Sequence, residues 1–354
     1  MNGYDSLLRL PVEDLDCVFN AVGPRWERLR GRRLLLTGGT GFIGKWLLGT
    51  FLHASRQLDL SARVVALSRQ PESFLREFPQ LRDAAEIEWI AGDVRELNIE
   101  LVGECDFAIH AATDVIAASS PATILDTCTA GTRRVLDVMT QGTAPRRVLL
   151  LSSGAVYGRT PPGVTTISED WAGAPDTLTS ASAYGEGKRV SELLCAMAAA
   201  TRPALDVAIA RCFAFVGPYL PFDKHFAIGN FIGAAMRNED IRIQGDGTPL
   251  RSYLYAADLA HWLWAMLFDA PNSRAYNVGG AEALSIGELA QRVNRILGGA
   301  GEIRIAQTPR PGLQPQAYVP SVDRIAAELG LIPAFSLDDA ILRTARWAAH
   351  SSLK

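Results

Sequence analysis

The chain has 354 residues, of which 48% are hydrophobic and 21% are charged, and its formal net charge is −3. These values are ordinary for a globular protein and leave no basic excess for a nucleic-acid partner. No apolar run approaches the ~18 residues of a membrane span, and the first residues do not have the pattern of a signal peptide. The five cysteines and five histidines are scattered, without the close pairs typical of a disulfide framework or a metal site. We therefore expect a cytoplasmic protein with reduced thiols and no bound metal.

Residues 1–30 carry apolar positions among charges, which predicts a short helical extension. From residue 31 onward, short apolar runs alternate with helical stretches. The predicted strands are 32–37, 62–67, 87–90, 106–110, 146–152 and 206–211, and the predicted helices are 42–54, 121–141 and 183–200. Strands that are apolar along their whole length are typical of a parallel sheet covered by helices on both faces. We interpret residues 31–215 as one doubly wound α/β domain.

After Gly217 and Pro218 the pattern changes to shorter strands mixed with helices. These strands are expected at 241–244, 252–255, 276–279 and 303–306, and the helices near 226–237, 256–270, 285–297 and 321–330. We interpret residues 216–354 as a smaller mixed α/β lobe. In doubly wound folds the ligand binds at the carboxyl edge of the sheet, so we expect this lobe to complete a cleft there.

A glycine-rich loop joins the first predicted strand to the first predicted helix. In TGGTGFIG the glycines have the spacing G-x-x-G-x-x-G. Such a turn lets the backbone approach a pyrophosphate, and the N–H groups of the helix N-terminus face its charge. The alternative is a glycine-rich turn without a ligand, but the strand before and the helix after it are the context of a dinucleotide site. We expect this site to include Gly38, Gly41, Phe42, Ile43 and Gly44.

The second predicted strand ends in Ser68 and Arg69. An acidic residue near this position would bind the ribose 2′-hydroxyl of NAD. A hydroxyl and a cation suit a 2′-phosphate better, which predicts a preference for NADP(H) and leaves NAD(H) as the second choice. The alternative interpretation of Arg69 is a solvated loop charge.

Two further strand ends carry candidate cofactor-binding residues. Asp93 and Val94 follow the third strand, and Asp93 is a candidate for the adenine amino group. Ala111, Ala112 and Thr113 follow the fourth strand, where small side chains would let a flat cofactor lie against the backbone. Each segment taken alone is compatible with simple turn chemistry, but their positions at consecutive strand ends support one site.

Tyr184 and Lys188, in SAYGEGK, are four residues apart, so on a helix they lie on the same face. One interpretation is an amphipathic surface helix with an incidental lysine. The chemical interpretation is that an ammonium near a phenol favours the phenolate and lowers a pKa that is ordinarily about 10. A phenol with a lowered pKa suits proton transfer at neutral pH.

Taken in the order TGGTGFIG, GDV, HAAT, LLSSGAVYG and YGEGK, these motifs resemble the extended short-chain dehydrogenase/reductases. More narrowly, they resemble the nucleotide-sugar epimerase/dehydratase/reductase branch, over about residues 32–330. The resemblance implies a Rossmann fold and, usually, a homodimer. It also implies that Tyr184 donates and accepts the proton, that Lys188 holds the nicotinamide ribose, and that Ser153 binds the sugar oxygen.

The residues after Ser153 bear on the type of reaction. Resembling 4,6-dehydratases carry an Asp-Glu pair there, whereas this chain has Gly154 and Ala155, and the glutamate of decarboxylating relatives is missing too. Elimination and decarboxylation are disfavoured, because each needs a titratable group in reach. We expect an NADPH-dependent reductase of an NDP-4-keto-6-deoxyhexose. The alternatives are a redox-neutral 4-epimerase with tightly bound NAD and, from another class, a catalytically silent dinucleotide-binding sensor.

The resemblance also assigns a nucleotide-diphosphate sugar to the C-terminal lobe. Asn230, Arg251 and Arg310 match positions that contact the diphosphate, and arginine suits this task because its planar donors fork onto phosphate oxygens. Either arginine taken singly is also compatible with a surface charge. Ala214 stands where the family usually has a substrate-contacting asparagine, which puts the common hexose substrates in doubt. His225 is either a cleft residue or, more simply, a loop histidine.

Overall fold

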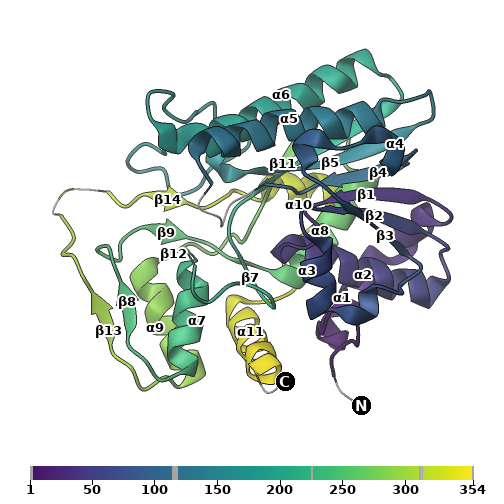
Figure 1. Cartoon of the computed structure of the whole chain (residues 1–354). Helices are drawn as coiled ribbons and strands as arrows, with labels where there is room; N and C mark the ends of the chain where they lie inside the picture. The colour runs from purple at the N-terminus through teal and green to yellow at the C-terminus, as the bar shows by residue number, and fades with distance from the viewer. Residues whose placement is uncertain (1–2, 114–118, 225, 311, 313, 353–354) are drawn as a thin grey trace. The chain divides into compact units, whose positions relative to one another are not determined.

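The structure is a computed structural model that describes residues 3–113, 119–224, 226–310, 312 and 314–352. Its largest sheet has seven strands in the order β11-β6-β5-β4-β1-β2-β3 (Figure 1). They are β1 (Arg33–Thr37), β2 (Arg63–Ser68), β3 (Ile87–Ala91), β4 (Phe107–His110), β5 (Arg146–Ser153), β6 (Leu205–Cys212) and β11 (Arg274–Val278). Strand β1 pairs in parallel with β2 and β4, β2 with β3, and β4 with β5. This order of β1 to β6 is that of the Rossmann fold and confirms the predicted fold class.

Helices cover both faces of this sheet (Figure 1). On one face, α5 (Pro121–Met139) and α6 (Ala183–Thr201) share a buried core with alternate residues of the strands, such as Leu35 and Leu150. On the other face lie α2 (Phe42–Leu58) and α8 (Ala256–Asp269), where the indole N–H of Trp264 donates a 2.9 Å hydrogen bond to Thr50. Burial of each large apolar side chain stabilises such a core by about 1.5–3 kcal/mol.

The N-terminal residues pack on α2 and α8 as part of the same unit. They form α1 (Val12–Val22) and the 3₁₀ helix η1 (Gly23–Leu29). The ring of Trp26 lies 4.9 Å from that of Trp264, and a Cβ added at Gly49 would lie 2.5 Å from the side chain of Leu10. The absence of a side chain at Gly49 therefore allows the N-terminal segment to approach α2 closely. The remaining short helices of this part are α3 (Pro71–Glu77), η2 (Pro79–Leu81), η3 (Val94–Glu96), α4 (Ile99–Val102), η4 (Gly154–Tyr157) and η5 (Ser180–Ser182).

The chain forms two compact units that alternate along the sequence. The first contains 1–156, 174–211 and 260–276, and the second contains 157–173, 212–259 and 277–354. The sequence pattern predicts one boundary, between residues 215 and 216. In the structure, residues 260–276 belong to the first unit again. The strand predicted at 276–279 as part of the C-terminal lobe is β11 at the edge of the seven-stranded sheet. That prediction was wrong about the sheet to which the strand belongs.

The described residues of the second unit form three small sheets and four helices of their own. Its strands are β7 (Phe215–Val216) with β10 (Leu254–Tyr255), β9 (Leu250–Arg251) between β12 (Leu284–Ser285) and β14 (Ala317–Tyr318), and β8 (Ile241–Ile243) with β13 (Ile303–Ile305). The helices are α7 (Ala227–Met236), α9 (Ile286–Leu297), α10 (Asp323–Leu329) and α11 (Leu337–Ser352). Helix α9 begins with a capping box in which Ser285 and Glu288 hydrogen-bond each other's backbone N–H groups. Helix α11 had not been predicted from the sequence.

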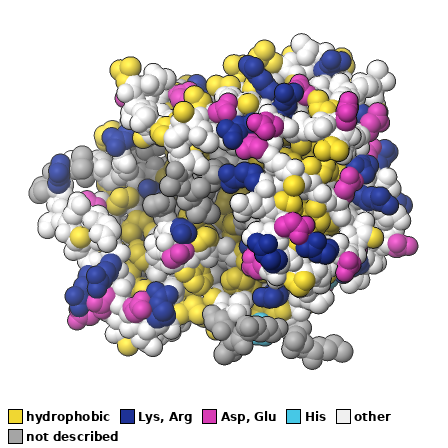
Figure 2. Space-filling view, in the orientation of Figure 1, with side chains coloured by type: hydrophobic (Ala, Val, Ile, Leu, Met, Phe, Trp, Pro, Cys, Tyr) yellow, Lys and Arg dark blue, Asp and Glu magenta, His cyan; other side chains and the backbone are white. Residues whose placement is uncertain are grey.

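Within the described part of the chain, none of the helices has the length and apolar character that crossing a membrane requires. The same residues contain no group of three or more His, Cys, Asp or Glu side chains placed to hold a metal ion. On the face shown in Figure 2, basic and acidic side chains are interspersed. That face therefore carries mixed charge.

Candidate functional site

The glycine loop between β1 and α2 has the geometry of an anion cradle. Gly38 has φ +74°, and a Cβ there would lie 2.8 Å from the backbone of Ala111. A Cβ at Gly44 would lie 2.3 Å from the carbonyl oxygen of Gly38. Gly41 is different, because its Cβ would approach the nearest protein atom only to 3.4 Å. The packing of the protein thus requires glycine at 38 and 44, while glycine at 41 leaves the start of α2 open to close approach by a pyrophosphate.

Gly41 is the N-cap of α2 and has no side chain that can cap the helix. No capping side chain at Gly41 therefore competes with an anion for the first-turn N–H groups of α2, which include those of the predicted residues Phe42, Ile43 and Gly44. These residues fit the pyrophosphate of a dinucleotide.

The turn after β4 is fixed by a buried hydroxyl. Thr37 Oγ1 accepts hydrogen bonds from the N–H groups of Ala111 and Ala112, at 3.2 and 3.1 Å, and lies 2.8 Å from His110 Nδ1. Because the hydroxyl already accepts two bonds, its proton goes to Nδ1, and the neutral imidazole carries its own proton on Nε2. Burial lowers the pKa of His110 to about 3, and the charge of Lys188 acts in the same direction. Next to this turn, the Thr113 hydroxyl donates a 2.7 Å hydrogen bond to the carbonyl oxygen of Ala112.

The end of β2 carries the two residues predicted to select the cofactor. Ser68 is half-buried, and its Oγ lies 3.4 Å from Thr40 Oγ1 of the glycine loop. Ser68 Oγ also accepts a 3.3 Å hydrogen bond from the N–H of Gln70. Arg69 is exposed beside it. A hydroxyl at the last residue of β2 and a cation at the next residue therefore lie beside the glycine loop.

Asp93 follows β3 and binds a neighbouring arginine. Its carboxylate accepts hydrogen bonds from Arg95 Nε and Nη2, at 3.0 and 2.9 Å, and from the Arg95 backbone N–H at 2.9 Å. The bonds to Arg95 hold the pKa of Asp93 below its ordinary value, and the charge of Arg69 contributes in the same direction. The Val94 side chain is buried, and a Cβ added at Gly131 of α5 would lie 2.8 Å from it. Asp93 is therefore an anchored acceptor at the predicted adenine end, and the Val94 side chain belongs to the core.

The predicted catalytic residues lie where β5 ends and α6 begins. Ser153 is the last residue of β5, and its Oγ accepts a 3.1 Å hydrogen bond from the N–H of Ala155. Tyr184 is in the first turn of α6 and is half-buried. Lys188 is one turn further on and is 3% exposed, and its Nζ donates a 2.7 Å hydrogen bond to the carbonyl oxygen of Leu151 in β5. The Tyr-Lys face of α6 is thus held against the carboxyl end of β5.

Glycines on α6 explain how the helix comes this close to its neighbours. A Cβ at Gly185 would lie 2.6 Å from the carbonyl oxygen of Ala155. A Cβ at Gly187 would lie 2.9 Å from the Cβ of Cys128 in α5. The small residues between the tyrosine and the lysine therefore bring α6 into contact with the segment after Ser153 on one side and with α5 on the other.

The second unit carries the three residues predicted to bind the diphosphate. Asn230 lies on α7, and its Nδ2 donates a 2.8 Å hydrogen bond to the carbonyl oxygen of Lys224. Arg251 lies in β9, with its guanidinium 5.7 Å from the centre of the Tyr318 ring. Arg310 follows β13 and lines a cavity of its own. His225 lies outside the described residues.

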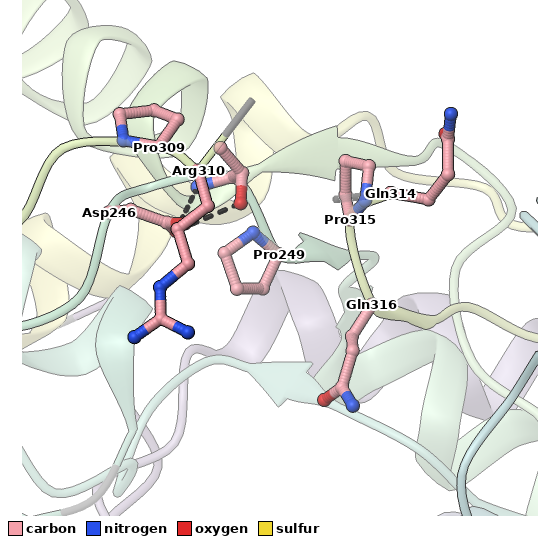
Figure 3. A pocket seen from close by; sticks show the side chains of 8 residues that line it. Asp246, Pro249, Pro309, Arg310, Gln314, Pro315 and Gln316 are labelled. Carbon is pink, nitrogen blue, oxygen red and sulfur yellow. Dashed lines mark hydrogen bonds between the residues drawn. The ribbon is translucent and has the colours of Figure 1, made fainter. Parts of the chain in front are cut away.

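The cavity at Arg310 has a volume of about 210 Å³. Figure 3 shows Arg310 and Asp246 on one side, Gln314 and Gln316 on the other, and proline rings among them. Thr248 donates two hydrogen bonds to Asp246, at 3.0 and 2.8 Å, which hold the pKa of this carboxyl below its ordinary value. The lining thus combines a guanidinium and a carboxylate with amide and apolar groups, which suits a ligand that has both polar and apolar parts.

The sequence interpretation missed the Thr37–His110 pair. The HAAT segment had been interpreted only through its small residues, and the histidine that begins it had no assigned role. The signal that was available is a threonine at the end of β1 and a histidine at the end of β4. Because these neighbouring strands pair Thr37 with His110 in register, a sheet prediction would have placed the two side by side.

Comparison with known proteins extends these observations. The family model described as "NAD dependent epimerase/dehydratase family" matches residues 34–279. UDP-glucuronic acid decarboxylase 1 of Xenopus tropicalis is 27% identical over 348 residues, which cover 95% of this chain and 77% of the relative. The dTDP-glucose 4,6-dehydratase of Streptomyces niveus is 26% identical over 322 residues, which cover 89% of this chain and 92% of the relative.

Among solved structures, MoeE5 in complex with UDP-glucose and NAD is 25% identical and has a TM-score of 0.70. The superposition covers 90% of this chain and 99% of MoeE5. The sequence and structure comparisons thus agree on one group of enzymes.

Proposed function

The chain belongs to the NAD dependent epimerase/dehydratase family, and on that premise we propose that it reduces an NDP-4-keto-6-deoxyhexose with NADPH. The observation that carries the proposal is the combination of residues where β5 meets α6. Ser153, Tyr184 and Lys188 are all present there. The two residues after Ser153 are Gly154 and Ala155, which have no titratable side chain. The acid and base steps of elimination and decarboxylation need a titratable group besides Tyr184, whereas reduction of a carbonyl needs only the proton of Tyr184.

In the proposed reaction the sugar carbonyl is reduced to an alcohol. When bound, NADPH would supply the hydride that C4 of the sugar gains. Tyr184 donates its phenolic proton to the carbonyl oxygen, which the Ser153 hydroxyl also hydrogen-bonds. Lys188 stabilises the phenolate that remains and holds the ribose hydroxyls. Its position at the Leu151 carbonyl supports this role, because the ammonium is already fixed before a ligand binds.

The residues at the end of β2 support NADPH as the cofactor. An acid would repel a 2′-phosphate, whereas Ser68 and Arg69 present a hydroxyl and a cation. The charge of Arg69 also acts on Asp93, which supports a position of the guanidinium near the proposed adenine end of the site.

We propose that the nucleotide-diphosphate part of the substrate binds residues of the second unit. Arg251 and Arg310 would bind the phosphates, with Asn230 as a further hydrogen-bonding residue. The observation that supports this assignment is the cavity at Arg310, whose lining combines this cation with the Asp246 carboxylate and with amide and apolar groups. MoeE5, which was solved with UDP-glucose, supports a substrate of this class.

The proposal is tested by incubating the purified protein with NADPH and either UDP- or dTDP-4-keto-6-deoxyglucose. We expect NADPH to be consumed in equal amount to the alcohol that forms, and NMR spectroscopy of the product identifies the new stereocentre. The matched control is Tyr184→Phe, which keeps the ring and removes the proton. A wild-type protein that leaves both keto sugars unchanged would contradict the proposal.

A redox-neutral 4-epimerase is the second candidate. The same serine, tyrosine and lysine suffice for it, and the presence of NAD in the MoeE5 complex favours it. This activity would interconvert UDP-glucose and UDP-galactose without added cofactor. A catalytically silent dinucleotide-binding protein, in contrast, would show neither reaction while still binding the cofactor.

We further propose that the protein is a homodimer that pairs through α5 and α6. Three large apolar side chains on these helices are exposed, Leu125 by 38%, Leu193 by 59% and Met197 by 56%. Light scattering after size exclusion should give the mass of a dimer, and Leu193→Glu should give that of a monomer. Leu178→Glu is the control, because Leu178 is 95% exposed outside these helices. A monomeric wild-type protein would contradict this assembly.

A further inference from the structure

A carboxylate on α6 reaches the strand that carries the proposed catalytic serine. The Ser152 hydroxyl donates a 2.5 Å hydrogen bond to Glu192 Oε1. Glu192 follows Lys188 by four residues and Tyr184 by eight, so all three side chains lie along one stripe of the helix. Since Lys188 binds the Leu151 carbonyl, α6 is tied to the end of β5 at two successive turns.

The carboxylate of Glu192 is itself fixed from a third element. Arg211 lies in β6, and its Nη2 and Nε donate hydrogen bonds of 2.7 and 3.0 Å to Glu192 Oε2 and Oε1. This is the bidentate arrangement in which an arginine restrains a carboxylate most strongly. The two side chains are only 17% and 12% exposed, so solvent competes little for these bonds. Glu192 is therefore held by β6 and in turn holds the hydroxyl of Ser152.

We propose that Glu192 is a positioning residue for the reaction. It fixes Ser152 relative to α6, and thereby sets the separation between the Ser153 hydroxyl and the Tyr184 phenol. The inference rests on the proposed function, in which these two groups meet at the same sugar oxygen. A displacement of about 1 Å between reacting groups can cost about 10²-fold in rate.

The network offers a mild test variant and a matched control. Ser152→Ala removes one oxygen atom and breaks the bond between Glu192 and β5, but leaves the pair of Glu192 with Arg211. Ser191→Ala removes the same atom from the residue next to Glu192. The Ser191 hydroxyl is equally buried and donates to the carbonyl oxygens of Cys128 and Gly187, at 2.9 and 3.0 Å, so it faces α5 instead of β5.

We expect Ser152→Ala to lower kcat about tenfold or more while the Kd for NADPH stays at the wild-type value. Ser191→Ala should keep kcat close to wild type. Both variants lose one buried hydroxyl, so both should lower the melting temperature, and Ser191→Ala at least as much, because the Ser191 hydroxyl also accepts a 2.9 Å hydrogen bond from Thr132. A purely structural role predicts equal effects on kcat in the two variants, and that result would overturn the inference.

A second readout does not depend on turnover and separates this inference from the proposed function. The phenol of Tyr184 is titrated by tyrosinate absorbance, as the difference between each protein and its Tyr184→Phe counterpart. If α6 shifts against β5, the Ser153 hydroxyl moves relative to the phenol, so the midpoint for Tyr184 changes in Ser152→Ala and stays in place in Ser191→Ala. If the wild type is inactive but the midpoint still shifts in Ser152→Ala, only the proposed function is refuted. If the midpoint does not shift in Ser152→Ala, the positioning role is refuted.

Discussion

The Nζ atom of Lys188 donates a 2.7 Å hydrogen bond to the carbonyl oxygen of Leu151, two residues before Ser153. The side chain is 3% exposed, so the carbonyl partly compensates for the water that the ammonium has lost. Burial lowers the pKa of the His110 imidazole, and the charge of Lys188 lowers it further. Burial raises the pKa values of the Cys128 and Cys195 thiols, and the charge of Lys188 opposes that increase. Burying this ammonium lowers the stability of the folded protein, because the charge loses its water. We therefore assign Lys188 a role in the reaction.

We expect Lys188→Met to lower turnover by about 10²–10⁴-fold, the usual contribution of acid–base groups. It should also weaken NADPH binding, because the ribose loses its cation. Tyr184→Phe should lose turnover to the same extent but bind NADPH like the wild type. Steady-state kinetics and a fluorescence titration of NADPH give the two quantities. Tight NADPH binding by Lys188→Met would show that the lysine does not hold the ribose.

Substitutions at two glycines of the loop should separate folding from cofactor binding. Gly44→Ala places a Cβ 2.3 Å from the Gly38 carbonyl oxygen, so the loop must distort and the protein should lose both stability and cofactor affinity. Gly41→Ala meets no atom closer than 3.4 Å, so it should keep the melting temperature and lose affinity alone. Thermal unfolding with and without NADPH distinguishes the cases. Unchanged NADPH affinity in Gly41→Ala would place the pyrophosphate elsewhere.

His110 should make stability fall in mild acid. Its pKa in the folded protein is about 3 because the ring is buried, against an ordinary value of 6.5. In the unfolded chain the His110 ring therefore binds a proton near pH 6.5, whereas in the folded protein it binds one only near pH 3. Above pH 6.5 the stability is fully present, and it is lost as the pH falls, by at most about 1.4 kcal/mol per pH unit.

His110→Gln keeps an acceptor for the Thr37 hydroxyl but does not titrate. Its free energy of unfolding, measured by urea denaturation, should fall less steeply with acid than that of the wild type. His261→Gln is the comparison. Burial lowers the pKa of His261 to about 4, so the loss of stability that His261 causes in acid should end near pH 4, whereas the loss that His110 causes continues to about pH 3. Parallel curves for wild type and His110→Gln would contradict the neutral assignment.

Arg310 should act on the substrate and not on the cofactor. Arg310→Ala removes a cation from the cavity of the second unit, and we expect KM for the nucleotide sugar to rise about tenfold or more, since bonds to charged groups contribute about 1.5–3 kcal/mol. The Kd for NADPH should not change. Arg304→Ala is the control for lost charge, because Arg304 is 60% exposed and pairs with Asp240. Equal KM values for Arg310→Ala and Arg304→Ala would show that Arg310 does not bind the substrate.

Local sequence patterns were sufficient for much of the fold. The glycine spacing with an apolar strand before it predicted β1 and α2, and the helix predicted at 183–200 begins at the same residue as α6. The sheet of β11 was assigned incorrectly, because its place depends on pairing with β6, about which its own residues carry no signal. Helix α11 was missed for lack of a recognised pattern near the end of the chain.

The site shows the same division between local and distant information. Ser153, Tyr184 and Lys188 belong to short motifs and were named from the sequence. The partners that hold the site together were not, because they are distant along the chain. Thr37 and His110 are 73 residues apart, and Ser152 and Glu192 are 40 apart. Such pairs follow from sheet register and helix packing, which a motif does not encode.

The most direct test of the central claim is to identify the cofactor that the purified protein retains and then titrate it with NADPH and NADH. The account predicts little retained cofactor and tighter binding of NADPH than of NADH, as expected of a reductase that exchanges its cofactor every turnover. Tightly retained NAD would contradict the role of Arg69 and make the redox-neutral epimerase the better description of this protein.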